Sequence, residues 1–301
     1  MRILDAHQRA VVALDYSRDG KLLASAGWDG LVCVWEVRTG RKLAVLNLGH
    51  QAALTVAFAA ARPMLAASFR TFERPGGAVG VFHLLSASRP DEVLLPYRLW
   101  QCEAECRSLA FMGGDQVLVA ADAPDRVRLW DLLQFRAVRQ LLCSGRVYSI
   151  SADLPTSRLA VLLHASGALK VFSFQTRRVM AELTHAQGRG HSVRFRPDGR
   201  QLAVAWGATV GLWSGQPGTE PVLLPHDETV LALAYRPDGK TLYTAGHDGL
   251  IWSWDCHSGH LLADPLDWQL DTLHALAIAP DGLTAAAATN TGQIVIWDIE
   301  D

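Results

Sequence analysis

Two groups of residues in this chain contain the side chains of a nucleophilic catalytic triad, each together with a tryptophan. In both groups a His, a hydroxyl residue, an Asp and a Trp follow one another at separations of 18, 4 and 6 residues. A histidine oriented by a carboxylate can activate a hydroxyl as a nucleophile. An active site would not be built twice at one spacing with a tryptophan included, so both groups are interpreted as structural and no catalytic residue is assigned. The groups are His7, Ser25, Asp29 and Trp35, and His226, Thr244, Asp248 and Trp254.

Metal-binding and phosphate-binding signals are weak. Cys102 and Cys106 could place two thiolates at the start of a strand, and His257 and His260 could place two imidazoles in a turn. Neither pair has a second pair at zinc-site spacing. Cys102 also occupies the position that a histidine holds in the two groups above, which favours a structural role. No glycine-rich loop leads into a helix that could bind a phosphate. The sequence therefore predicts no metal and no cofactor.

The same aromatic position recurs along the whole chain. Seven short apolar strands each end in Trp or Phe, and the steps between these aromatics are 47, 48, 42, 41, 41 and 43 residues. A repeat of this length is too long for a hairpin and too short for a domain. It fits a four-stranded unit that buries its faces by stacking against copies of itself. The strand-ending aromatics are Trp35, Phe82, Trp130, Phe172, Trp213, Trp254 and Trp297.

Within one repeat the pattern is strand, turn, strand without a helical period. Residues 17–20 and the pair Asp29–Gly30 are turns, because Asp-Gly sequences tolerate the backbone angles of tight hairpins. Apolar strand segments lie before, between and after them, and residues 42–46 form the last strand of the repeat. The second repeat carries about four extra residues around 69–77.

The spacing, the turn residues and the terminal Trp-Asp pairs resemble the WD-repeat β-propeller family over essentially the whole length. The resemblance implies an all-β, seven-bladed propeller with four-stranded antiparallel blades around a central channel, formed by residues 1–301 as a single domain. It also implies that the two groups of four are buried hydrogen-bond chains, from Asp to His, from His to Ser or Thr, and from there to the indole. The other blades lack the set, so blades two, three, four and seven are expected to be locally less stable.

Ring closure is predicted from what remains at the two ends. No residues are left after Trp297 for a fourth strand, while residues 1–4 form an apolar strand that the first repeat does not use. We expect residues 1–4 to pair with the last blade, which removes an exposed sheet edge.

In the family, one face of the ring commonly binds partners: it carries the loops before each first strand and the turns between second and third strands. On that face, Trp28 and Trp206 are the expected anchors, because exposed Trp is favoured at interfaces. Flat packing over its own blade is the alternative for each. Cationic loop residues are expected over blades one, four and five, and acidic ones over blades six and seven. The remaining candidates are Arg9, Arg146, Arg189, Glu228, His247, Asp271 and Asn290.

Composition limits the function classes. The chain of 301 residues has a net charge of −2, which gives no pull toward nucleic acid or a membrane surface. Five scattered cysteines and an N-terminus without a signal-peptide core predict a cytoplasmic protein. The predicted function is a non-enzymatic scaffold for a protein or peptide partner, as a monomer or as a subunit of a complex. The alternative is a hydrolase or lyase with its site at the channel mouth.

Overall fold

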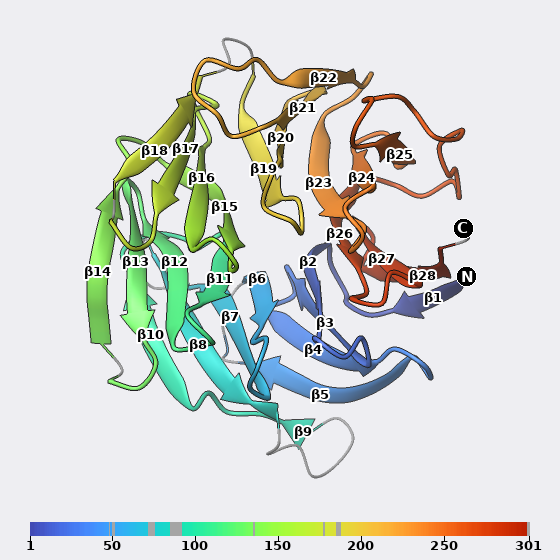
Figure 1. Ribbon diagram of the computed structural model, residues 1–301. Helices are drawn as coiled ribbons and strands as arrows, with labels where there is room; N and C mark the ends of the chain where they lie inside the picture. The colour runs from blue at the N-terminus through green and yellow to red at the C-terminus, as the bar shows by residue number, and fades with distance from the viewer. Residues whose placement is uncertain are drawn as a thin grey trace.

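The computed structural model describes residues 1–47, 49, 52–71, 76–84, 92–134, 136–176, 178–184 and 188–299. Seven antiparallel sheets surround a central axis, and the chain colour passes around the ring from blue to red (Figure 1). In blades one to six the first strand in sequence lies next to the axis and later strands lie progressively outward. The all-β seven-bladed propeller is therefore confirmed.

The strands of the first four blades are as follows. Blade one contains β2 (Val11–Tyr16), β3 (Leu22–Gly27), β4 (Leu31–Glu36) and β5 (Arg41–Asn47). Blade two contains β6 (Ala52–Phe58), β7 (Met64–Arg70), β8 (Gly77–His83) and β10 (Arg98–Cys102). Blade three contains β11 (Leu109–Met112), β12 (Val117–Ala123), β13 (Arg126–Asp131) and β14 (Arg136–Leu142). Blade four contains β15 (Val147–Asp153), β16 (Arg158–Leu163), β17 (Leu169–Ser173) and β18 (Val179–Leu183).

The remaining blades continue the order. Blade five contains β19 (Gly190–Phe195), β20 (Leu202–Trp206), β21 (Thr209–Trp213) and β22 (Val222–Pro225). Blade six contains β23 (Val230–Tyr235), β24 (Thr241–Gly246) and β25 (Ile251–Asp255). Blade seven contains β26 (Leu273–Ile278), β27 (Thr284–Thr289), β28 (Gln293–Asp298) and β1 (Arg2–Asp5). In the described residues no helix has the length and apolar character needed to cross a membrane.

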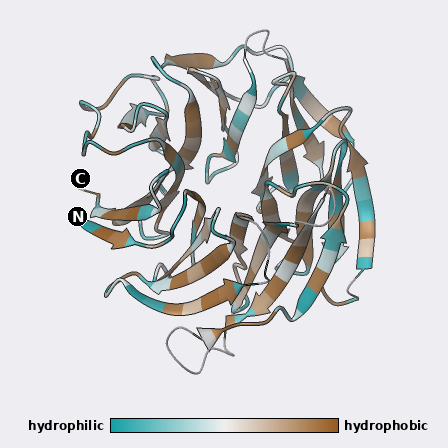
Figure 2. Cartoon of the chain, turned by 180° about the vertical axis from the view of Figure 1, so that it is seen from behind, coloured by the Kyte–Doolittle hydropathy of each residue, from teal (hydrophilic) through white to brown (hydrophobic). Residues whose placement is uncertain are grey.

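The core lies between blades rather than at one centre. Seven apolar clusters are present, and each combines residues of two neighbouring blades. Between blades one and two, for example, Leu46 packs with Phe69 and Phe82, all fully buried. Hydrophobic residues accordingly run along the strands while many connecting loops are hydrophilic (Figure 2). Each blade depends on both neighbours to bury its faces.

The N-terminal strand closes the ring, as predicted. β1 pairs antiparallel with β28, from Arg2 opposite Ile296 to Asp5 opposite Gln293. The Gln293 amide also donates to the Asp5 carboxylate at 3.0 Å. The two ends of the chain lie side by side at the rim (Figure 1). Residues from opposite ends of the sequence thus form one four-stranded blade.

Two blades depart from the regular pattern. Blade six has no regular fourth strand, and only isolated bridges, Ile251 with Leu266 and Trp254 with Leu261, cover the outer side of β25. Blade one gains a fifth strand, β9 (Glu92–Val93), which pairs parallel with β5. This strand belongs to the connection between β8 and β10 of blade two, and Leu94 after it is buried in the cluster between blades one and two. The sequence pattern did not indicate β9.

The extra residues of the second repeat lie only partly in the described chain. Phe69 and Arg70 belong to β7 and Gly77 begins β8, with Phe69 opposite Ala78 and fully buried. Residues 72–75 lie outside the described residues. The strand-forming ends of the 69–77 segment are therefore part of the sheet and its core.

Candidate functional site

The loops before each first strand and the turns between second and third strands form one face of the ring. A backbone hydrogen bond joins the two in blade after blade, from Trp28 N to Ala10 O at 2.9 Å in blade one and from Asn290 N to Thr272 O at 2.9 Å in blade seven. Because the innermost strands all start at this end, the loops lie around one mouth of the channel. We call this side the loop face.

The innermost strands enclose a channel of about 410 Å³. Its wall consists mainly of small apolar side chains and backbone, interrupted by a few polar groups. At the end near the loop face the lining includes Trp28, Arg107, Tyr148, His191 and His274. The channel mouth and the loop face are therefore continuous.

Blade one contains the complete predicted hydrogen-bond chain. His7 Nδ1 lies 3.0 Å from an Asp29 carboxylate oxygen and His7 Nε2 lies 2.8 Å from the Ser25 hydroxyl. The Trp35 indole donates to the same hydroxyl at 2.9 Å. Burial alone would raise the pKa of Asp29, but the hydrogen bond and charge of His7 together with backbone N–H donors lower it. These contacts hold the loop, the turn and the strand end together, which is a structural role.

Blade six contains only part of the chain, and the predicted bond between Asp248 and His226 is wrong. His226 Nε2 lies 2.7 Å from the Thr244 hydroxyl, which accepts the Trp254 indole at 3.1 Å. Asp248 instead accepts the indole of Trp252 at 2.7 Å. His226 Nδ1 lies 3.1 Å from the carbonyl oxygen of Leu224. Burial lowers the pKa of His226, which keeps it neutral at pH 7. The cause of the difference is Trp252, whose counterpart two residues before Trp35 in blade one is Cys33.

Blade three lacks the hydrogen-bonded His, Ser or Thr, and Asp residues, and its strand-ending tryptophan has an unpaired indole. The Trp130 indole nitrogen is buried and has no hydrogen-bond partner. Counting back 10 residues from this tryptophan gives Ala120, which has no hydroxyl, where blade one has Ser25. The lower local stability predicted for blades two, three, four and seven stays a prediction.

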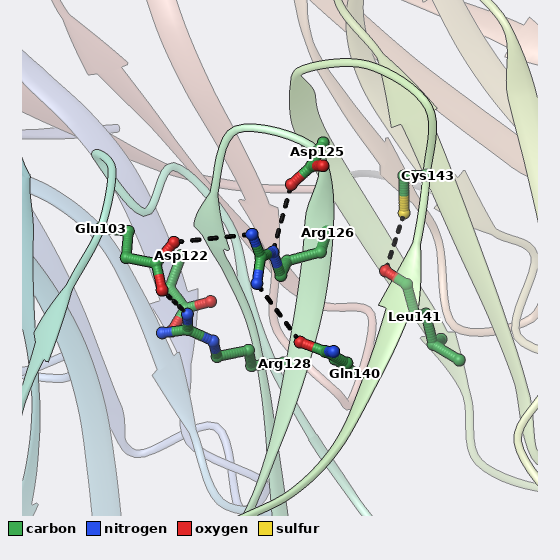
Figure 3. A network of polar contacts seen from close by, with 8 residues as sticks. All are labelled: Glu103, Asp122, Asp125, Arg126, Arg128, Gln140, Leu141 and Cys143. Atoms are coloured by element: carbon green, nitrogen blue, oxygen red, sulfur yellow. Dashed lines mark hydrogen bonds and ion pairs between the residues drawn. The ribbon is translucent and has the colours of Figure 1, made fainter.

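A different polar network ties blade three to the end of blade two (Figure 3). Arg128 donates to Asp122 at 3.3 Å and is paired with Glu103, and Arg126 lies 3.7 Å from a Glu103 carboxylate oxygen. Burial raises the pKa of Asp122 to about 6, although the charge of Arg128 opposes the rise. Arg126 also contacts Asp125 at 3.1 Å. The two arginines of this network are thus paired with the three carboxylates, Glu103, Asp122 and Asp125.

Trp28 is exposed on the loop face and forms the centre of a patch. Its side chain is 42% exposed, and its ring centroid lies 5.8 Å from that of His274 in blade seven. His274 Nε2 lies 3.2 Å from the Asn290 side-chain oxygen, and the Asn290 amide donates to Asp271 at 3.4 Å. Burial lowers the pKa of His274. The structure thus brings three predicted residues, Trp28, Asp271 and Asn290, together through His274.

Trp206 is not on the surface, so its predicted role as an anchor is wrong. Its side chain is 1% exposed and belongs to the apolar cluster between blades four and five. Its indole donates to the carbonyl oxygen of Gly167 at 2.7 Å. Gly211 leaves room for the ring, because an added Cβ there would lie 2.5 Å from it. A tryptophan with a neighbouring blade available above it packs instead of reaching solvent, which is the alternative considered from sequence.

The other predicted loop residues are exposed but separate. Arg9, Arg189, Glu228 and His247 are exposed, and none of them appears in an ion pair within the described chain. Arg146 is exposed and lies 3.6 Å from Glu105. Arg9, Arg146 and Arg189 lie in blades one, four and five, while Glu228 and His247 both lie in blade six, so the five residues do not form one cluster.

A second group at the mouth was not predicted. Tyr148 stacks on His164 with centroids 4.5 Å apart, and His191 lies 5.9 Å from Tyr148. The Arg107 guanidinium lies 5.6 Å from the Tyr148 ring and bonds to Glu105 at 2.6 Å. Burial, with the nearby charge of His164, lowers the pKa of His191 to about 4. Tyr148 and His191 are each the second residue of an innermost strand, Arg107 lies two residues before one, and His164 directly follows β16.

The cysteines are unsuited to reactivity. All five are free and buried, and burial raises the pKa of Cys102 to about 12 and that of Cys143 to about 11. Among the residues that the structure describes, no group of three or more His, Cys, Asp or Glu side chains could hold a metal ion.

Comparison with known proteins agrees with this architecture. The family model described as "WD domain, G-beta repeat" matches residues 1–36 and 219–255, which include both sequence groups with His, Asp and Trp. Periodic tryptophan protein 2 of Arabidopsis thaliana is 25% identical over 85% of this chain and 23% of its own length. The guanine nucleotide-binding protein subunit beta of Oryza sativa subsp. japonica is 23% identical over 84% of this chain and 70% of its own length.

Transducin beta-like protein 3 of Rattus norvegicus is 26% identical over 54% of this chain and 22% of its own length. The chain therefore spans less than a quarter of the length of the periodic tryptophan and transducin beta-like relatives. The matched repeats, the similarity to these relatives and the seven-bladed ring all support the resemblance of the chain to WD-repeat β-propellers.

Proposed function

We propose that this protein is a non-enzymatic scaffold that binds a protein or peptide partner on the loop face, centred on Trp28. The observation that carries the proposal is an exposed indole fixed against His274 at the channel mouth. A large aromatic side chain held in place before binding loses little conformational entropy when a partner covers it. The family resemblance supports a role in protein assemblies, since WD-repeat relatives include a guanine nucleotide-binding protein subunit.

The charges around Trp28 indicate which partner chemistry fits. Asp271 lies beside Asn290 on the same patch, and Glu228 and Asp227 are exposed on neighbouring blade six. A partner segment with an apolar side chain for the indole and nearby Lys or Arg residues would be complementary to this surface.

The enzyme alternative has less support. It requires His247, Asp271 and Glu228 to converge on one substrate. In the described part of the chain, no hydrogen bond or ion pair joins any two of them. Repetition of the His, Ser or Thr, and Asp groups in two blades is explained by their structural contacts.

The proposal is tested by quantitative affinity capture with the wild-type protein and Trp28→Ala. Proteins captured by the wild type should fall at least tenfold with Trp28→Ala, while the melting temperature stays within about 2 °C because the side chain is exposed. Leu223→Ala is the matched control, since Leu223 is 50% exposed on the outer strand of blade five. Equal capture by Trp28→Ala and wild type, or equal loss with Leu223→Ala, would reject the loop-face site.

We further propose that the protein acts in the cytoplasm as a monomer or as one subunit of a complex. Five buried free thiols without a disulfide are compatible with a reducing compartment. Fractionation with a disulfide-state measurement of the five cysteines checks this.

A further inference from the structure

The channel contains a guanidinium group whose charge has no carboxylate at ion-pair distance among the described residues. Arg194, on the innermost strand β19, lines the channel. Its Nη1 donates to the carbonyl oxygen of the preceding Val193 at 2.9 Å, so the group turns back toward the strand edge that faces the channel. A guanidinium has five N–H donors, and this bond uses one of them. The remaining donors are available inside the channel.

Two serine hydroxyls lie against the backbone on either side of Arg194. The Ser149 oxygen accepts the backbone N–H of Val193 at 3.2 Å, and the Ser151 oxygen accepts that of Phe195 at 3.0 Å. Both serines are on β15 and line the channel. Because each oxygen already accepts a backbone N–H, its own O–H is free to donate. Residues 193 and 195 flank Arg194, so the interface of blades four and five carries one guanidinium and two hydroxyl groups.

The charges on the wall leave Arg194 only partly compensated. The formally charged lining residues are Asp15, Arg107 and Arg194. Arg107 is bonded to Glu105 at 2.6 Å. Asp15 attracts Arg194 across the channel, but its carboxylate accepts the backbone N–H of Phe58 at 2.6 Å. Arg194 is an exposed residue, so its charge faces the open space of the channel. The surrounding protein lowers the pKa of Arg194, and the charge of Asp15 opposes this shift.

We propose that the central channel binds a phosphate-type oxyanion at Arg194, with the hydroxyls of Ser149 and Ser151 as further donors. A planar guanidinium matches the oxygens of phosphate in a two-point contact, and hydroxyl donors complete the coordination. The volume of about 410 Å³ accommodates a small anion with some of its water. This site goes beyond the partner surface, because Arg194 is near the end of β19 that is remote from the loop face.

Asp15 is the group that opposes the anion. Among the lining residues that the structure describes, it alone carries a formal negative charge, and burial raises its pKa to about 6. His191 and His274, which also line the channel, are largely neutral at pH 7 because burial lowers the pKa of each. For an anion whose own charge does not change with pH, binding should therefore strengthen as the pH falls toward 6, when Asp15 takes up a proton.

Isothermal titration with inorganic phosphate tests the site, with potassium chloride at equal ionic strength as the blank. The wild type should bind one phosphate per chain. Arg194→Met should weaken binding at least tenfold, and Asp15→Asn should tighten it several-fold at pH 7.5. The control Arg189→Met removes a charge of the same sign from the loop at the other end of β19 and should change affinity less than twofold.

Several results would overturn the site. These are no saturable heat with the wild type, equal affinity of Arg194→Met and wild type, or an equal loss in Arg189→Met. Weaker binding by Asp15→Asn would overturn it as well, and this variant gives a result even if Arg194→Met fails to fold. Titration does not involve the loop-face partner, so failure here leaves the scaffold proposal standing and the reverse is also true.

Discussion

The indole nitrogen of Trp252 donates to a carboxylate oxygen of Asp248 at 2.7 Å, and this bond separates the two blades that share a sequence motif. In blade one the corresponding carboxylate, Asp29, binds His7. In blade six the Trp252 indole binds the Asp248 carboxylate in place of the histidine. His226 Nδ1 instead lies next to the backbone carbonyl oxygen of Leu224. Identical spacing therefore leads to two different hydrogen-bond chains.

Double-mutant cycles should distinguish the two blades. Replacing His7 and Asp29 by Ala, singly and together, should give a coupling free energy of about 1 to 2 kcal/mol, because each removes the other's buried partner. The same cycle with His226 and Asp248 should give a coupling within about 0.5 kcal/mol of zero. Urea denaturation of the wild type and the six variants measures both values. Equal coupling in the two blades would contradict the difference in bonding.

The unpaired indole of Trp130 should be open to repair. Ala120→Ser places a hydroxyl where blade one has Ser25 and should raise the free energy of unfolding by about 1 kcal/mol, because a buried donor gains an acceptor. Ala121→Ser is the control, since it adds the same group to the apolar cluster between blades three and four and should destabilise the protein. Thermal denaturation measures both, and a gain in neither or in both variants would argue against the repair.

Trp206 should be important for stability and unimportant for partner capture. Trp206→Ala removes a fully buried ring and its bond to Gly167, so we expect a loss of about 3 to 5 kcal/mol. Trp28→Ala, on an exposed ring, should cost about 1 kcal/mol or less. Chemical denaturation of both variants checks the order. A Trp206→Ala protein that unfolds like the wild type would show that the ring is not buried in solution.

Asp15 should make stability decrease as the pH rises through about 6. Because burial raises its pKa from 3.8 to about 6, the folded chain binds a proton more tightly than the unfolded chain between these values. The stabilising contribution is full below 3.8 and lost above 6. The upper limit is about 3 kcal/mol, which water in the channel should reduce to roughly 1 kcal/mol.

Asp15→Asn should therefore stabilise the protein at pH 7.5 and lose this advantage at pH 4. The amide oxygen can still accept the backbone N–H of Phe58, so the loss of charge is the main change. Denaturation at the two pH values measures the difference. A gain of equal size at both would show that Asp15 has an ordinary pKa.

Ring closure should control global stability. Deleting residues 1–5 removes β1 and exposes the edge of β28, so the melting temperature should fall by several degrees or more. The point variant Gln293→Ala, which removes only the bond to Asp5, should lower it by less than about 2 °C. A deletion variant that melts like the full chain would refute closure by β1.

Sequence periodicity was sufficient for the fold because the repeated unit is local. The aromatics at Trp35 and Trp254, the Asp-Gly turns and the apolar strands each depend on neighbouring residues, and a blade can bury its faces only against another blade. Even ring closure followed from counting strands at the two ends. β9 was missed because two residues that pair with another blade leave no period in the sequence.

The candidate site was less predictable from sequence, because it depends on contacts between side chains of different blades. Trp28 and Trp206 occupy the same position in their repeats, but one meets His274 at the mouth and the other is covered between blades four and five. Arg194 gave no sequence signal, since its significance lies in the channel and in two serines on the neighbouring blade. The sequence of a single repeat therefore does not predict which residues of the neighbouring blade its side chains will contact.

The pairing of β1 with β28 determines how the ring would respond to mechanical load. The strands are antiparallel, so the start of β1 and the end of β28 lie at the same end of the pair, where Arg2 is opposite Ile296, while Asp5 is opposite Gln293 at the other end. Tension between Arg2 and Asp298 therefore acts on the hydrogen bonds between β1 and β28 one after another, starting at the Arg2 end. The pairing of β1 with β28, which completes the ring, is therefore also the contact at which a small force would open the ring.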